Sequence, residues 1–365
     1  MSRQPATQIV DVAERILLDI RRRKLRAGDA YLGTAETAKL LRISGSTVNR
    51  AFQLLARRGV VERRQRRGTI VLDPQRKRPP NLQRVHLLVR EDHLQAEGLW
   101  ADGVLMGLQQ ELPGVELQFN FRPIADEAEY VQQVIDEMLR SRWAAGLVLI
   151  RTGVVTQRLV QASGLPAVVS GTLQPSISGL PSIDRDQAQI GKLLAEHLLK
   201  QRCRRFLILM RDRITAGDHL MLDAALQTLA AAGVVLDRVT LRFLPSDTEA
   251  IVAEVQKLLP QLGSALGCLC RSERLANGVL TAANATPFKV TRVPKIVVAD
   301  VAQPDANTNR FPCIESSISP EDWGRRIGRL LLNAARGDVT SYQHEIVPVR
   351  IMESFESQIG LTQRR

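Results

Sequence analysis

The sequence predicts an α/β protein made of an N-terminal winged helix-turn-helix and a larger, two-lobed α/β domain. Three observations predict this architecture. Residues 28–71 have the apolar spacing of two consecutive helices, followed by two short strands around a turn. From residue 84 onward, short apolar runs alternate with amphipathic segments, as in sheets whose strands are joined by helices. The length of 365 residues exceeds one ordinary domain.

The excess positive charge lies in the first fifth of the chain. The net charge is +12, and residues 1–80 hold 19 Lys or Arg and 7 Asp or Glu, whereas the remaining residues hold 31 of each. This distribution indicates an anionic polymer, such as double-stranded DNA, as partner of the first part only. The alternative is a solvated basic surface. The bias ends at the basic, proline-containing run DPQRKRPP, so we expect domains at 1–73 and 83–365 joined by a linker at 74–82.

Three helices are expected in the N-terminal domain. The first spans 7–24, with apolar residues at three- and four-residue steps, Thr7 as its N-cap and basic residues in its last turn. The second has Thr34 as its N-cap and ends near Arg42. The third begins at Ser44 and buries one apolar face.

The third helix and the following hairpin carry side chains that suit DNA. The segments 60–64 and 69–72 are predicted to pair as strands around an arginine-rich tip, which suits a minor groove. Hydroxyl, amide and guanidinium groups bond to base edges and phosphates. The candidate DNA-binding residues are Thr34, Ser44, Ser46, Thr47, Asn49, Arg50, Gln53, Arg64, Arg66, Arg67 and Gly68.

Several short motifs in residues 8–72 carry a resemblance to a known family. They are Gly28-Asp29, Ile43-Ser44, Thr47-Val48, Leu54-Leu55, Arg58-Gly59-Val60-Val61, Glu62-Arg63-Arg64-Gln65 and Arg67-Gly68-Thr69. With these motifs the segment resembles the GntR family of bacterial winged-helix regulators. The resemblance implies that this domain binds DNA.

The segment also departs from that family. The family usually has arginines that contact phosphates and bases at the positions of Ala35, Gly45 and Asn49. In this chain Arg50 stands where the family often has an acidic residue, and Arg66 replaces a wing glycine. The segment therefore keeps its basic residues, but at other positions, and we expect the wing to make more of the DNA contacts.

Two series of strands and helices make up the rest of the chain. The alternation indicates parallel sheets covered by helices, and two similar halves indicate two lobes with a ligand cleft. Ligands of such sheets bind outside the carboxyl ends of the strands. The expected strands are 84–90, 115–122, 145–150, 166–170, 205–211, 239–243, 266–270, 295–300 and 345–350.

Several stretches in this part carry a second, looser resemblance. Three of them are LPAVVSG at 165–171, SIDRDQAQIGKLLAEHLLKQRCRRFLIL at 182–209 and IVVAD at 296–300, and to these are added LQTLAAAGV at 226–234 and WGRRIGRLLLNAARG at 323–337. The part resembles the periplasmic-binding-protein-like sensor domain of the lac-repressor family. Joined to a GntR-type head, the chain is similar to regulators of the arabinose-repressor type. This implies a homodimer and a small-molecule effector, with a sugar as one candidate.

Polar and aromatic residues at strand ends are the candidate effector-binding residues. The resemblance implies that carboxylates at Asp184 and Asp300 line the cleft, where they would accept sugar hydroxyls. Asp184 and Asp218 are also suited to cap the following helices, and Asp218 stands where the family often has an arginine. Arg271 is a weaker candidate. The candidates are Asp92, Trp100, Arg151, Ser170, Asp184, Asp218, Ser272 and Asp300.

The four cysteines are expected in the apolar core. Cys268 and Cys270 lie in an apolar run with no histidine near, so a metal or redox role is a minor alternative, and no cofactor is expected. The chain has no apolar run of 18 residues and no signal-peptide pattern at its start. We therefore expect a cytoplasmic protein.

These features favour a ligand-responsive transcription regulator that is not an enzyme, with relief of repression as the expected sign. One alternative is a fusion to a pyridoxal-phosphate-dependent aminotransferase-like domain, which needs a Schiff-base lysine. The lysines after residue 81 are Lys192, Lys200, Lys257, Lys289 and Lys295, and none has the expected surroundings. Another alternative is a DNA-binding protein without a ligand.

Overall fold

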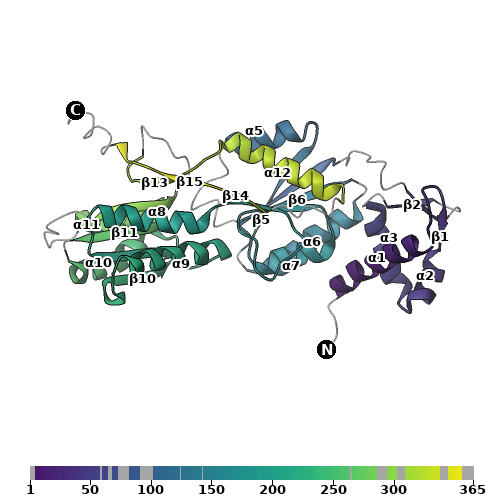
Figure 1. Ribbon diagram of the computed structural model, residues 1–365, viewed down its shortest axis with the longest axis horizontal. Helices are drawn as coiled ribbons and strands as arrows, with labels where there is room; N and C mark the ends of the chain where they lie inside the picture. The colour runs from purple at the N-terminus through teal and green to yellow at the C-terminus, as the bar shows by residue number, and fades with distance from the viewer. Residues whose placement is uncertain are drawn as a thin grey trace. The chain divides into compact units, whose positions relative to one another are not determined.

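The structure is a computed structural model of the chain (Figure 1). It forms two compact units, which are Met1–Arg90 with Leu108–Ser182 and Arg325–His344, and Glu91–Gly107 with Ile183–Gly324 and Glu345–Arg365. Across the described part of the chain, no helix combines the length and apolar character that crossing a membrane requires. The structure describes residues 5–57, 60–64, 68–72, 82–90, 102–123, 125–141, 143–263, 265–285, 294–301, 309–337 and 344–355.

The first part of the chain folds as a winged helix-turn-helix, as predicted. Its helices enclose an apolar core that includes Ile16, Phe52 and Leu55. The predicted hairpin forms, with Arg64 opposite Gly68, and a short strand that was not predicted pairs with its second strand. The elements are α1 (Pro5–Arg22), β1 (Ala30–Tyr31), α2 (Thr34–Leu41), α3 (Gly45–Arg57), β2 (Val61–Arg64) and β3 (Gly68–Val71).

Two helix starts differ from the prediction. α1 begins at Pro5, so Thr7 lies inside the helix and is not its N-cap. Gly33 is the N-cap of α2, and its backbone N–H donates to the Glu36 carboxylate at 2.9 Å. The carboxylate of Glu36, three positions after the N-cap, satisfies the N–H of Gly33. Thr34 is therefore the first residue of the helix and not its cap.

The first sheet has the strand order β14-β8-β7-β6-β4-β5. β4 pairs in parallel with both β5 and β6, and β6 with β7. Leu88, Leu147 and Val169 pack on one face with apolar residues of α6 and α7. The elements are β4 (Arg84–Arg90), α5 (Asp102–Glu111), β5 (Glu116–Arg122), α6 (Glu127–Arg140), β6 (Ala145–Ile150), α7 (Val154–Ser163), β7 (Ala167–Ser170), β8 (Ser182–Arg185), α12 (Pro320–Ala335) and β14 (His344–Val347).

The second sheet has the order β10-β9-β11-β12-β13-β15. Within the described part of the chain, β13 and β15 pair antiparallel and the other neighbouring strands of this sheet pair in parallel. Phe206 and Ile208 of β9 pack toward α8 and α9, whereas Leu207 and Leu209 pack toward α10 and α11. Helices therefore cover both faces. The elements are α8 (Gln187–Lys200), β9 (Arg205–Arg211), α9 (Ala216–Ala231), β10 (Val239–Leu244), α10 (Thr248–Leu262), β11 (Leu266–Ser272), α11 (Glu273–Ala285), β12 (Lys295–Asp300), β13 (Cys313–Ser316) and β15 (Val349–Met352).

The predicted last strand is in fact two strands that belong to different sheets. β14 ends at Val347 in the first sheet, and β15 begins at Val349 in the second. Pro348 separates them, because proline has no N–H to donate to a sheet. Cys268 and Cys270 lie fully buried in the apolar core of the second sheet, as expected.

Candidate functional site

The start of α3 carries hydroxyl groups held in a local network. The Ser44 hydroxyl accepts from the backbone N–H of Thr47 at 3.2 Å, as an N-cap does. It is also hydrogen bonded to the hydroxyls of Ser46 at 3.0 Å and Thr47 at 2.7 Å. Ser46, Arg50 and Gln53 are exposed at steps of four and three residues, so they lie on one side of α3. This side of α3 therefore has a helix N-terminus, which attracts phosphate, and the long polar side chains of Arg50 and Gln53.

Arg63 of β2 reaches the starts of both α2 and α3. Its guanidinium donates to Oδ1 of Asn49, and to Oγ1 of Thr34 at 3.3 Å. The same guanidinium lies 6.0 Å from the centroid of the Phe52 ring. The proposed DNA-reading residue Asn49 is thus engaged by an arginine of the protein. The positive charge of Arg63 therefore lies beside position 49, although residue 49 itself is an asparagine.

The tip of the wing is only partly described. Arg66 and Arg67 lie outside the described residues, and of Arg64 only the backbone is described. Gly68 is exposed and has a φ of 77°, a conformation that glycine adopts readily. The DNA contacts of the three arginines stay a prediction.

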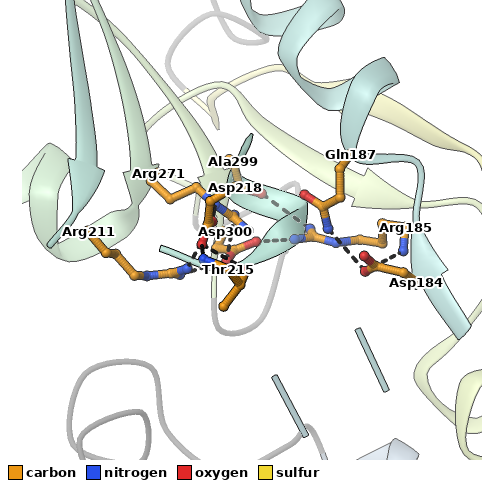
Figure 2. A network of polar contacts seen from close by, with 9 residues as sticks. All are labelled: Asp184, Arg185, Gln187, Arg211, Thr215, Asp218, Arg271, Ala299 and Asp300. Atoms are coloured by element: carbon orange, nitrogen blue, oxygen red, sulfur yellow. Dashed lines mark hydrogen bonds and ion pairs between the residues drawn. The ribbon is translucent and has the colours of Figure 1, made fainter. Parts of the chain in front are cut away.

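A second group of charged side chains lies at the carboxyl ends of the second sheet (Figure 2). Arg211 ends β9, Arg271 is the penultimate residue of β11 and Asp300 ends β12, and these three strands are neighbours. Asp218 in the first turn of α9 and Arg185 at the end of β8 complete the group. These five residues are called the arginine–aspartate cluster below.

Both carboxylate oxygens of Asp218 are bonded within the protein. Oδ1 accepts from Nε of Arg271 at 2.5 Å, and Oδ2 accepts from the N–H and the hydroxyl of Thr215 at 2.7 and 2.9 Å. Thr215 is the N-cap of α9, so Asp218 completes a capping box and is not itself the cap. Burial disfavours the ionised form, but the charges of Arg271 and Arg211 and these hydrogen bonds outweigh it and lower the pKa of Asp218 to about 2.

Three guanidinium groups converge on the buried carboxylate of Asp300. Oδ1 accepts from Nη2 of Arg185, and Oδ2 accepts from Nη2 of Arg211 at 2.7 Å. Oδ2 also lies 2.7 Å from Nη1 of Arg271. Nη1 of Arg185 donates in addition to the carbonyl of Ala299 at 3.2 Å. These charge-assisted bonds hold the ends of β8, β9, β11 and β12 together.

Asp184 lies beside the cluster but does not cap the next helix. Its Oδ1 accepts from the backbone N–H of Arg185 at 2.8 Å and from Nε2 of Gln187 at 3.0 Å. The N-cap of α8 is Asp186, whose Oδ1 accepts from the N–H of Gln189 at 2.8 Å. The interpretation of Asp184 as the cap of this helix is therefore wrong, because the cap is two residues later.

The other predicted effector residues have different positions. Ser272 is buried at the end of β11, next to the cluster in sequence. Arg151 and Ser170 belong to the other compact unit, where the Arg151 N–H donates to the Ser170 carbonyl at 3.1 Å. The candidates outside the described residues are Asp92 and Trp100.

Sequence reasoning missed Arg185 and Arg211 and ranked Arg271 low. Arg211 ends an apolar strand, as Asp300 does, so its strand-end position was a signal that could have found it. The partners are not visible in the sequence, because Arg185 and Asp300 are 115 positions apart. Only the fold brings them together.

Residues 8–71 match the family described as bacterial regulatory proteins, gntR family. The match spans the three helices and the wing, so this part is a DNA-binding domain of the gntR type. None of the curated protein sequences compared with the chain matches it.

Solved structures of transcription regulators share the fold of the larger part. The transcriptional regulator CelR in complex with cellobiose is 17% identical, with a TM-score of 0.62 over 84% of this chain and 89% of its own. A LacI family regulator from Enterococcus faecium with bound ribose is 13% identical, with a TM-score of 0.59 over 74% and 98%. The lac repressor dimer bound to operator and the anti-inducer ONPF is 13% identical, with a TM-score of 0.60 over 74% and 93%. At these identities the likeness shows the fold.

Proposed function

We propose that the chain is a sequence-specific transcriptional repressor whose affinity for its DNA operator is controlled by a small molecule. The observation that carries the proposal is the union of two features in one chain. A gntR-type winged helix presents polar side chains on an exposed side of α3, and a polar cluster lies at strand ends of a sheet with the fold of LacI family regulators. Neither feature alone would indicate regulation by a ligand.

In the proposed DNA complex, α3 enters the major groove and the wing contacts the backbone or minor groove. The exposed Arg50 and Gln53 reach base edges and phosphates, and the hydroxyls around Ser44 bind phosphate at the helix N-terminus. Arg66 and Arg67 of the wing add positive charge on the basis of the sequence. The net charge of the N-terminal domain supports this role, because phosphate neutralisation supplies most of the non-specific affinity.

The proposed effector binds at the carboxyl ends of the second sheet, beside the arginine–aspartate cluster. This is where open α/β sheets bind ligands. A sugar is one candidate, since related folds have been solved with cellobiose and with ribose. The effector changes operator affinity only if it binds the DNA-competent and DNA-released conformations with different affinity.

The proposed regulator acts in the cytoplasm as a homodimer on a pseudo-palindromic operator. Two-fold symmetry of the protein then matches the symmetry of two half-sites, as in dimeric helix-turn-helix proteins. The lac repressor structure with the same fold is a dimer on its operator, which supports this assembly.

The test is a titration of a labelled duplex with the full chain, followed by fluorescence anisotropy. The duplex is first selected from a random pool by binding to the protein. We expect tight binding that weakens steeply with salt, and release of the duplex by at least one small molecule that raises the melting temperature. Selection without any enriched sequence would contradict the proposal.

A further inference from the structure

The arginine–aspartate cluster presents cations, and not carboxylates, to its surroundings. The side chains of Arg185 and Arg211 are 17% and 11% exposed, whereas those of Asp218 and Asp300 are 2% and 5% exposed. The cluster holds three guanidinium groups and two carboxylates. A molecule that reaches it therefore meets positive charge first.

The carboxylate oxygens of the cluster are already engaged within the protein. Asp218 is held by Arg271 and by Thr215, and both oxygens of Asp300 accept from arginines. A neutral sugar has hydroxyl groups that donate best to carboxylates. A sugar that displaced one of these arginines in order to donate would leave a buried ionised carboxylate with a lost partner, which is costly. Asp184, the third carboxylate in Figure 2, already accepts two N–H groups on one oxygen.

We infer that the effector is an anion, a small polyhydroxylated molecule whose carboxylate or phosphate group binds Arg185 and Arg211. The inference rests on the proposed function and specifies the class of its ligand. Guanidinium groups bind carboxylate and phosphate through paired N–H donors, so the acid group and the arginines are complementary. The N-terminal end of α9 at Thr215 adds a favourable dipole on the same side.

The test compares matched acids and neutral sugars on the full chain by thermal shift and isothermal calorimetry. The probes are gluconate, arabinonate, galacturonate and glucose 6-phosphate, set against glucose, arabinose and galactose, with inorganic phosphate as a further anion. We expect at least one organic anion to raise the melting temperature and to bind at least about tenfold more tightly than its neutral parent. Carboxylate recognition predicts that a sugar acid binds most tightly, and phosphate recognition predicts glucose 6-phosphate.

Variants of the cluster identify where the anion binds. Arg185→Met and Arg211→Met each remove one exposed guanidinium, and we expect at least about tenfold weaker anion binding in each. Arg213→Met is the matched control, since Arg213 is exposed two residues after Arg211 and its loss should leave binding unchanged. If Arg211→Met does not fold, Arg211→Lys keeps the charge but not the paired donors and serves in its place.

Three results would overturn the inference. They are equal binding of a neutral sugar and its acid, binding by none of the anions, and unchanged anion binding in folded Arg185→Met and Arg211→Met. DNA affinity is measured in the same samples to separate this inference from the proposed function. Release of DNA by a neutral sugar alone would remove the inference and keep the function. Anion binding that leaves DNA affinity unchanged would keep the anion-binding site but remove its regulatory role, and with it the proposed function.

Discussion

Arg271 and Asp300 lie at the carboxyl ends of adjacent parallel strands, and Nη1 of the arginine is 2.7 Å from Oδ2 of the aspartate. Nε of the same arginine lies 2.5 Å from Oδ1 of Asp218, at the start of α9. One buried guanidinium therefore connects two strands to a helix. It neutralises charges that would otherwise be buried without sufficient compensation.

We expect Arg271→Met to destabilise the protein by about 3 kcal/mol, because loss of one partner leaves buried carboxylates undercompensated. Arg211 and Arg185 remain near Asp300, so complete unfolding is not expected. The measurement is urea unfolding of the full chain followed by circular dichroism. Arg205→Met is the control, since Arg205 is exposed at the opposite end of β9. Equal stability of the two variants would refute a central role for Arg271.

The stability of the protein should depend on the ionisation of Asp218 in acid. Its pKa is lowered to about 2 in the folded protein, whereas the unfolded chain has the ordinary value of about 3.9. The contribution, on the order of 2 to 3 kcal/mol, is present above pH ~4 and is lost as the pH falls through ~2. We expect Asp218→Asn to remove this pH dependence.

The pH prediction is measured as the difference in unfolding free energy between wild type and Asp218→Asn across that range. This difference cancels the contribution of His86 and His197, whose pKa values are lowered by burial and which act at higher pH. Asp212→Asn, at an exposed position close in sequence, is the control. A difference that stays constant from pH 5 to pH 2 would show that Asp218 is not held in its ionised form.

The close approach of α8 and α9 depends on Gly191. A Cβ atom at this position would lie 2.0 Å from the Met221 carbonyl oxygen and 2.9 Å from the backbone nitrogen of Ala225. Gly191→Ala must therefore separate the two helices, and we expect a loss of about 2 kcal/mol in urea unfolding. At Gly153 a Cβ has open space, so Gly153→Ala should cost little. A neutral Gly191→Ala would mean that these helices are not packed as described.

The contact between Arg63 and Asn49 should appear as coupling in DNA binding. Arg63 is oriented by Asn49 and Thr34, so Arg63→Ala and Asn49→Ala remove parts of one unit. We expect the double variant to lose about 1 kcal/mol less DNA affinity than the sum of the single losses. Arg50→Ala, combined with Asn49→Ala in the same anisotropy assay, is the comparison pair. Fully additive losses of DNA affinity in the Arg63→Ala and Asn49→Ala variants would show that the two residues act independently.

The elements were predictable wherever local pattern determines them. β9 has five consecutive buried apolar residues and β12 has four, and the bounds of both strands match the prediction. β8 and β13 were not predicted, because their four-residue sequences SIDR and CIES hold at most two apolar residues each, too few for a clear pattern. The strand predicted at 345–350 is divided by Pro348 into β14 and β15. These two strands belong to different sheets because they pair with strands that are far away in sequence.

The site was predictable only in part. Asp300 and Asp218 were indicated by the resemblance to the lac-repressor family, and in the structure Asp300 ends a strand and Asp218 lies in the first turn of a helix. The contacts from Arg185, Arg211 and Arg271 that decide their chemistry include residues up to 115 positions apart, which no local pattern shows. The engagement of these carboxylates by arginines could therefore be seen only in the folded structure.

The measurement that bears most directly on the central claim is operator affinity with and without a bound effector. Full-length protein is titrated onto its selected duplex by fluorescence anisotropy, in buffer and with the small molecule that raises its melting temperature most. We expect the ligand to weaken operator binding by about tenfold or more, because the two sites are coupled. We expect the same response in the control variant Arg213→Met. Operator affinity that is unchanged at saturating ligand would contradict regulation by a ligand.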